Sequence, residues 1–288
     1  MHGFALIDKP AGMTSHDVVA KARKKFNTKR VGHAGTLDPM ATGVLVLGVG
    51  SATRLLQFVT DGQKQYEAVI RLGQSTHTDD REGEVIETKS ALTISDEQIR
   101  ECLAKFVGKI QQKPSSVSAI KIDGKRAHER VRAGEEVDIP AREVLISDIK
   151  IIGITTESEF KDIQVVITCS AGTYIRAIAR DLGEILEVGG HLTELRRTLV
   201  SPFDISQCTS LEEAELITVA EGISKILPVR TIDFADQNEV SFGRAISPSE
   251  ISGPVAALDA SGEFVALLLD KELAGRNVAT PTLVSVKE

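Results

Sequence analysis

Asp38 is the only acidic residue in a glycine-rich stretch that runs from Lys29 to Thr53. It stands between Leu37 and Pro39, and the stretch carries five glycines, which let another segment of backbone approach closely. Aspartate before proline is commonly a turn or helix cap, because its oxygen accepts backbone N–H groups. An ionised carboxylate can also attack carbon or remove a proton. The residues alone therefore leave two interpretations of Asp38, a cap and a catalytic group.

The chain before Asp38 is basic, and secondary structure is predicted on both sides of the loop. Residues 21–30 hold six Lys or Arg and no acid, an environment that attracts phosphate. A strand is predicted over 4–7, and a helix capped by Thr14 and Asp17 follows it. The apolar run 44–47 predicts another strand directly after the loop. These elements would present one carboxylate at the tip of a loop.

Tyr66 lies on a predicted strand, residues 65–73, whose side chains alternate between apolar and polar. The alternation places Tyr66 on the core face with Ala68, Ile70 and Leu72. A lone tyrosine at such a position usually packs in the core with its hydroxyl satisfied at an edge. The chain has only two tyrosines, and the other is Tyr174.

Tyr174 and Arg176 stand at a predicted junction between a strand, residues 163–169, and a helix. One interpretation of Arg176 is a solvated surface residue, as most arginines are. The helix is predicted from apolar residues at helical spacing: Ile175, Ile178, Ala179, Leu182, Ile185 and Leu186. A scaffold helix with a capping box at Ser95 and Gln98 is predicted from a similar stripe: Ile99, Cys102, Leu103, Phe106 and Val107.

Residues 30–39, Arg-Val-Gly-His-Ala-Gly-Thr-Leu-Asp-Pro, closely resemble the signature of the TruB family, bacterial tRNA pseudouridine synthases that act on the T loop. The resemblance implies that Asp38 is catalytic and that His33 helps to hold the flipped nucleotide or its neighbours. Residues 172–176, Gly-Thr-Tyr-Ile-Arg, resemble a second motif, which implies that Arg176 pairs with Asp38 and that Tyr174 supports the site. Tyr66 resembles the active-site tyrosine that stacks on the target base.

Other segments resemble further family motifs. Lys9, in a Lys-Pro motif, would support the catalytic loop, and Asp80 would lie near the active site, in a loop where His77 replaces the usual Asp. Leu195, in residues 189–198, would form an apolar wall of the base pocket. The stretch from Lys113 resembles the start of an RNA-binding insertion, in which His128 replaces a Tyr. Phosphate contacts are expected there from basic residues: Lys125, Arg126, Arg130 and Arg132.

The resemblance also implies the fold. It predicts an α+β protein with the pseudouridine synthase fold, built on a mixed, largely antiparallel central sheet. Residues 1–229 would form the catalytic domain, with the insertion at about 113–142, and residues 230–288 a small β-rich, PUA-like domain. Short apolar runs at 255–258 and 264–269, separated by glycine turns, agree with a β-rich end.

Charge is unevenly distributed along the 288 residues, whose net charge is -7. Residues 1–150 carry 23 Lys+Arg against 20 Asp+Glu, and residues 151–288 carry 11 against 21. Local basic patches, rather than total charge, would therefore bind phosphates. The three cysteines show no metal-ligand spacing, so we expect free thiols, no metal and no cofactor. With no signal peptide and no long apolar run, we expect a cytoplasmic protein without a membrane partner.

The predicted function is conversion of uridine 55 in the T loop of tRNA to pseudouridine. The partner would be the T stem-loop of tRNA, and the protein would act as a monomer without an obligate protein partner. An RNA-binding protein without catalysis is the alternative, although an acid within the most basic stretch would repel phosphate. A nucleotide-binding enzyme is disfavoured, because Thr53 stands where a G-x-G-x-x-G motif needs its third glycine.

Overall fold

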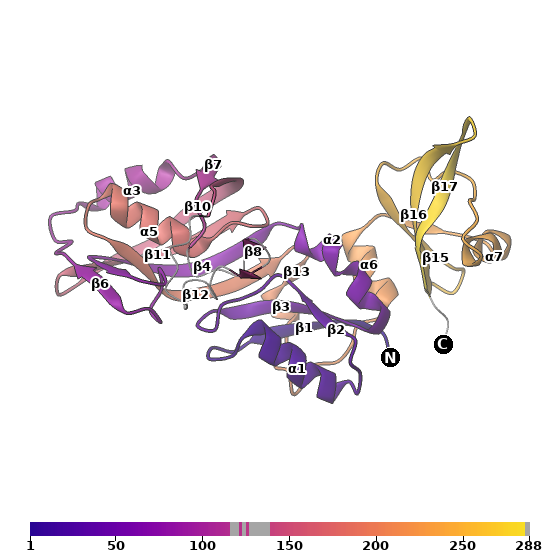
Figure 1. Cartoon of the computed structure of the whole chain (residues 1–288), viewed down its shortest axis with the longest axis horizontal. Helices are drawn as coiled ribbons and strands as arrows, with labels where there is room; N and C mark the ends of the chain where they lie inside the picture. Colours follow the sequence, from indigo (N-terminus) through magenta and orange to yellow (C-terminus); the bar gives the residue numbers. More distant parts are fainter. Residues whose placement is uncertain (116–120, 123–124, 127–138, 286–288) are drawn as a thin grey trace.

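A computed structural model describes residues 1–115, 121–122, 125–126 and 139–285, with side chains described in 1–115 and 139–285. A large sheet occupies most of the molecule, and a smaller four-stranded sheet lies at the C-terminal end (Figure 1). The expected class, α+β with a mixed, largely antiparallel sheet and a small β-rich C-terminal part, is confirmed.

The large sheet has nine strands in the order β1-β3-β12-β4-β11-β10-β7, with β2 paired to β3 and β13 paired to β12. Its strands are β1 (Gly3–Lys9), β2 (Val31–Ala34), β3 (Thr42–Val49), β4 (Lys64–Leu72), β7 (Gly108–Gln112), β10 (Arg142–Glu157), β11 (Phe160–Cys169), β12 (Gly190–Val200) and β13 (Phe203–Asp204). All pairings are antiparallel except the short one between β3 and β12, where Arg196 lies opposite Thr42 and Arg197 opposite Gly43. This parallel contact joins two halves of the sheet, and we call it the seam.

The helices and smaller elements surround these strands. Near the N-terminal half lie α1 (Ser15–Lys25), η1 (Gly50–Leu55) and α2 (Leu56–Thr60), and near the other half lie α3 (Asp96–Ala104), α5 (Ile175–Ile185) and two small hairpins, β5 (Gln74–Thr76) with β6 (Val85–Thr88) and β8 (Lys121–Ile122) with β9 (Lys125–Arg126). After β13 come η2 (Ile205–Gln207), α6 (Val219–Ile226), β14 (Val229–Thr231), α7 (Phe234–Ser241), β15 (Pro254–Leu258), β16 (Phe264–Leu273) and β17 (Arg276–Val284).

Local sequence signals set the starts of the helices. Thr14 caps α1 and forms a capping box with Asp17, and Ser95 does the same with Gln98 at α3. Each box satisfies backbone N–H groups that the first turn of a helix leaves unpaired. Both predicted caps are confirmed.

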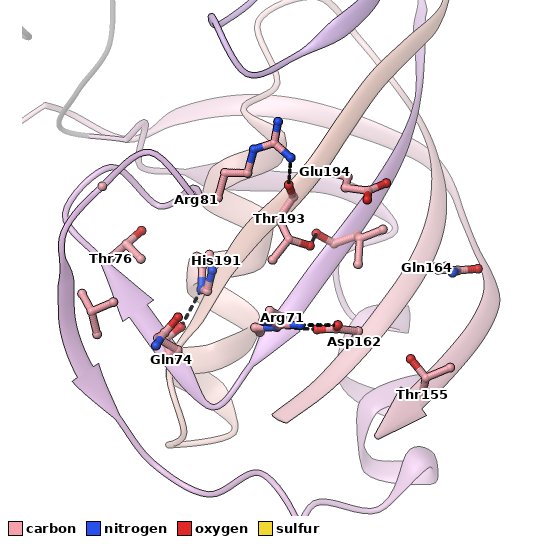
Figure 2. Close-up of a pocket in the computed structure, with 13 residues that line it drawn as sticks. Arg71, Gln74, Thr76, Arg81, Thr155, Asp162, Gln164, His191, Thr193 and Glu194 are labelled. Carbon is pink, nitrogen blue, oxygen red and sulfur yellow. Dashed lines mark hydrogen bonds and ion pairs between the residues drawn. The ribbon is translucent and has the colours of Figure 1, made fainter. Parts of the chain in front are cut away.

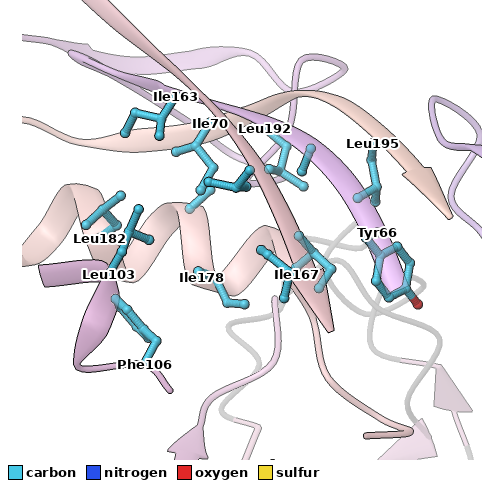
Figure 3. Packing of buried hydrophobic residues seen from close by; sticks show 14 of the residues in the cluster. Tyr66, Ile70, Leu103, Phe106, Ile163, Ile167, Ile178, Leu182, Leu192 and Leu195 are labelled. Carbon is cyan, nitrogen blue, oxygen red and sulfur yellow. The ribbon is translucent and has the colours of Figure 1, made fainter. Parts of the chain in front are cut away.

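Helices α3 and α5 cover one face of β4, β11 and β12 and bury an aliphatic cluster there (Figure 3). Ile70 and Ile167 are fully buried in this cluster, and each such side chain stabilises the fold by about 1.5–3 kcal/mol. Tyr66 lies at one end of the cluster, with its hydroxyl pointing away from the aliphatic side chains (Figure 3). The apolar stripes predicted for α5 and α3 each included a residue that the core does not bury. Ile185 is 51% exposed and Val107 is 45% exposed. Both lie at or beyond the end of their helix, where the core no longer covers them.

The C-terminal sheet, β14-β15-β16-β17, shares a core with the N-terminal half of the large sheet. Ala256 and Leu267 belong to the same apolar cluster as Phe4 and Val200. Helix α6 packs closely against β1, since a Cβ at Gly222 would lie 2.3 Å from the ring of Phe4. Among the helices in the described ranges, none is long and apolar enough to cross a membrane.

Candidate active site

Asp38 projects from a loop between β2 and β3 that is fixed from two sides. The hydroxyl of Ser15, at the start of α1, donates to the carbonyl of Leu37 (3.1 Å) and accepts from its N–H (2.8 Å). The buried ammonium of Lys9 donates to the carbonyls of Pro39 (3.3 Å), Met13 (2.7 Å) and Pro10 (2.9 Å). These bonds anchor the residues on either side of Asp38, whose side chain remains 35% exposed.

The carboxylate of Asp38 binds the guanidinium of Arg176. Nε of Arg176 lies 3.0 Å from Oδ2 of Asp38, and Nη2 lies 3.3 Å from Oδ1. Such a two-pronged contact to a planar guanidinium fixes the direction of a carboxylate. Asp38 therefore makes the expected ion pair. Its backbone carbonyl also accepts from the N–H of Ala41 at 3.1 Å, so Asp38 opens a turn, but among the described residues its side chain caps no backbone N–H.

Arg176 also holds Asp80. Its Nη1 lies 3.5 Å from Oδ2 of Asp80 and donates to the carbonyl of Thr78 at 2.7 Å. The side chains of Arg176 and Asp80 are 6% and 4% exposed, so this part of the network is almost out of water. Arg176 thus binds both carboxylates, Asp38 and Asp80.

A cavity of about 270 Å³ opens beside the Asp38–Arg176 pair. Tyr66, Tyr174 and Leu195 line it, as the resemblance implied. Burial raises the pKa of the Tyr66 hydroxyl, and the nearby charge of Arg197 opposes that rise. The hydroxyl therefore stays protonated at neutral pH, next to an aromatic face on which a base could stack.

Lys9 and His33 are not among the residues that line this cavity. Burial lowers the pKa of Lys9 to about 8, against the opposing charge of Asp38. The ring of His33 packs edge-on against His16, with centroids 5.5 Å apart, and burial lowers its pKa, helped by the charge of His16. Five of the eight predicted site residues thus line the cavity, whereas Asp80, Lys9 and His33 do not.

Family models match almost the whole chain beyond its first residues. The TruB family pseudouridylate synthase N-terminal domain matches residues 23–175, and two C-terminal domain models match residues 176–228 and 227–280. The chain belongs to the TruB family of pseudouridine synthases. It is thus identified as an isomerase by its family.

Relatives of this TruB-family chain are similar along nearly their full length. The tRNA pseudouridine synthase B of Corynebacterium glutamicum (strain R) is 51% identical over 283 residues, covering 96% of this chain and 94% of the relative. That of Corynebacterium diphtheriae is 48% identical over 290 residues, covering 97% of each. In a solved Cbf5-Nop10-Gar1 complex, one chain has a TM-score of 0.70 at 25% identity, covering 99% of this chain and 84% of that one.

Several residues that line the TruB-family cavity were missed by the sequence reasoning: Lys64, Arg142 and Arg197. Burial lowers the pKa of Lys64 to about 8, and its ammonium donates to the carbonyls of Thr60 and Gly62. Arg197 donates to the carbonyls of Val44 (2.8 Å) and Gly35 (3.1 Å), which ties β12 to the approach of the Asp38 loop. The alternation of side chains along a strand could have predicted two of them. Lys64 lies two residues before Tyr66, and Arg197 lies two residues after Leu195, so each points to the same face of its strand as a predicted site residue.

A larger hollow, of about 480 Å³, lies on the opposite face of β4 (Figure 2). Its carboxylate Asp162 accepts two hydrogen bonds from Arg71, at 2.8 and 2.6 Å. Nδ1 of His191 is hydrogen-bonded to the carbonyl of Gln74 at 3.0 Å. These groups already satisfy one another, so size alone does not make this hollow the reactive site.

The expected phosphate contacts of the insertion lie outside the residues whose side chains are described: Lys125, Arg126, Arg130 and Arg132. His128 does so as well. Within the described side chains, no group of three or more His, Cys, Asp or Glu could hold a metal ion.

Proposed function

We propose that this protein converts uridine 55 in the T loop of tRNA to pseudouridine, and that Asp38 is the group that reacts. The observation that carries the proposal is the Asp38–Arg176 ion pair at the wall of a cavity lined by Tyr66 and Leu195. Relatives named tRNA pseudouridine synthase B, about half identical over nearly the full length, support tRNA as the substrate.

The reaction breaks the bond between ribose C1′ and N1 of uracil, turns the base, and joins C1′ to C5. It needs an ionised carboxylate, which can attack C1′ or C6 or remove the C2′ proton. Arg176 aims Asp38, because its planar guanidinium contacts both carboxylate oxygens. The partial exposure of Asp38 leaves its free edge open to a substrate.

The target base must leave the RNA stack to reach this carboxylate. Tyr66 offers a ring for stacking near the C5 proton, Leu195 an apolar wall, and Tyr174 support for the site. Lys9 steadies the loop that carries Asp38, and His33 holds neighbouring nucleotides. Asp80 fixes the far side of Arg176. The partner is the T stem-loop, and the protein acts in the cytoplasm as a monomer without an obligate protein partner.

The test is tritium release from a T-arm transcript labelled at C5 of uridine, because C5 loses its proton when it bonds to C1′. Wild-type protein should release tritium, and Asp38→Asn should not, although it should still bind the RNA. Asp148→Asn, an exposed position on β10, is the matched control and should behave as wild type. Release by Asp38→Asn at the wild-type rate would disprove the role of Asp38. RNA binding without release by the wild type would favour the binding-only alternative.

A further inference from the structure

Gln112, the last residue of β7, hydrogen-bonds to the backbone of Tyr174. Its Oε1 accepts from the N–H of Tyr174 at 2.7 Å, and its Nε2 donates to the carbonyl of Tyr174 at 3.0 Å. Gln112 is 1% exposed, so both bonds are shielded from water. The amide thus fixes the backbone of Tyr174 in the way a neighbouring strand would, and its removal would leave two backbone groups unpaired.

Arg142 holds the same tyrosine by its ring. It lies directly opposite Gln112 in the pairing of β7 with β10. Its guanidinium lies over the ring of Tyr174, 4.9 Å from the centroid, and donates to the carbonyl of Gly172. A planar cation over an aromatic face restricts how the ring can turn. Two adjacent residues of the sheet edge therefore fix both the backbone and the side chain of Tyr174.

Tyr174 is also where α5 begins. It is the N-cap residue, and its side chain makes no capping hydrogen bond. The bond from its N–H to Gln112 therefore fixes the entry to the helix from outside the helix. Arg176, two residues later, carries the guanidinium that binds Asp38. A shift at Tyr174 would move that guanidinium, and a displacement of about 1 Å can lower a rate about 100-fold.

We propose that Gln112 and Arg142 are positioning residues, which hold Tyr174 and thereby place Arg176 against Asp38. The inference rests on the proposed function for its catalytic consequence, whereas its geometric part concerns the protein alone. Both residues lie at the ends of strands that flank residues 113–141, so they link the base of that segment to the reactive pair. The rival role for Arg142 is direct contact with RNA phosphate, since this cationic side chain lines the cavity.

Single-turnover tritium release from the labelled T-arm tests the catalytic consequence. Gln112→Ala and Arg142→Ala should each lower the rate constant about tenfold or more, with the Kd for RNA changed less than about twofold. Gln111→Ala, at an exposed neighbour on β7, is the control and should match wild type. Arg142→Lys separates the roles, because lysine keeps the charge but lacks the planar group. A rate as low as that of Arg142→Ala supports positioning, and a restored rate supports phosphate contact and overturns it.

Gln112→Glu provides a second variant of the same shape should the alanine variant fail to fold. Its carboxylate still accepts from the N–H of Tyr174, but its other oxygen faces the carbonyl and repels it. Protonation restores the donor, so its rate deficit relative to wild type should shrink as the pH falls. A deficit that does not change with pH would count against the hydrogen bond to the carbonyl.

The chain has two tyrosines and no tryptophan, which allows a test that needs no activity. Protein labelled with ¹³C-tyrosine should give two ring signals, and Tyr66→Phe assigns them. Gln112→Ala and Arg142→Ala should shift the Tyr174 signal and leave that of Tyr66, while Gln111→Ala leaves both. A lowered rate with an unmoved Tyr174 signal would overturn positioning. An inactive wild type with the expected shifts would defeat the proposed function but retain the geometric link.

Discussion

Replacing Arg176 with methionine should separate its role in stability from its role in the reaction. The substitution keeps most of the length of the side chain and removes the charge. It leaves Asp38 and Asp80 without the guanidinium that binds them both. The side chain of Asp38 is 35% exposed and that of Asp80 is 4% exposed. Water can solvate the first, so the loss of that contact costs about 1 kcal/mol or less in stability. The second is almost fully buried, and it determines the size of the effect.

Breaking a buried ion pair by removing one partner costs about 3–5 kcal/mol, because the other charge stays buried. Asp80 retains two bonds, from the hydroxyl of Thr78 at 2.5 Å and from the N–H of Glu82 at 3.0 Å. We therefore expect Arg176→Met to lower the free energy of unfolding by about 3 kcal/mol, at the lower end of that range.

Adding Asp80→Asn to Arg176→Met should restore most of the stability and none of the activity. Asparagine keeps an oxygen for Thr78 and Glu82 but carries no charge. The measurements are guanidinium chloride unfolding at neutral pH, and tritium release from the labelled T-arm. If the double variant is no more stable than Arg176→Met, the buried charge of Asp80 is not the source of the loss. If the double variant releases tritium at the wild-type rate, Asp38 does not need the guanidinium.

Three further predictions follow from other parts of the structure. Gly43→Ala should destabilise the protein by about 3 kcal/mol in chemical unfolding, because its φ is +101° and a Cβ would lie 2.1 Å from a carbonyl oxygen of β12. Gly12→Ala, with φ +81° and open space, should cost only about 1–2 kcal/mol. In urea unfolding, the wild type should become more stable relative to Lys64→Met as the pH rises from 8 to 10.5. Burial lowers the pKa of Lys64 in the folded protein to about 8, so the unfolded chain holds this proton to a higher pH. Ile70→Ala, fully buried, should cost about 2–5 kcal/mol of unfolding free energy, and Ile152→Ala, 55% exposed, about 0.5 kcal/mol or less.

Local elements were predictable because their signals are local. The cap at Thr14 and the alternation around Tyr66 each depend on residues within a few positions, and both predictions are confirmed. The position of β12 was not predictable in this way, since it pairs with β3 through two residue pairs far away in the sequence. Ile185 was misplaced because spacing shows the apolar stripe of a helix but not where the core stops covering it.

The residues of the site were predictable from local sequence, but the contacts between them were not. Asp38 stood out as the lone acid of its stretch, but its contact with Arg176 spans 138 positions and was expected only through the family resemblance. The hydrogen bonds of Gln112 to the backbone of Tyr174 span 62 positions and have no residue pattern of their own. Backbone contacts of this kind depend on register, which hydrophobic pattern does not fix between distant strands.

The central place of β12 has a consequence for the order in which the protein can become active on the ribosome. Asp38 leaves the exit tunnel early, with β1 and β3, but the strand that joins these to the rest of the sheet is made of residues 190–200. Until that strand has emerged, no strand pairing among the described residues joins the half of the sheet beside Asp38 to the half that carries Tyr66. Under the proposed function, a ribosome-bound fragment that lacks β12 therefore lacks the complete sheet on which the site is built.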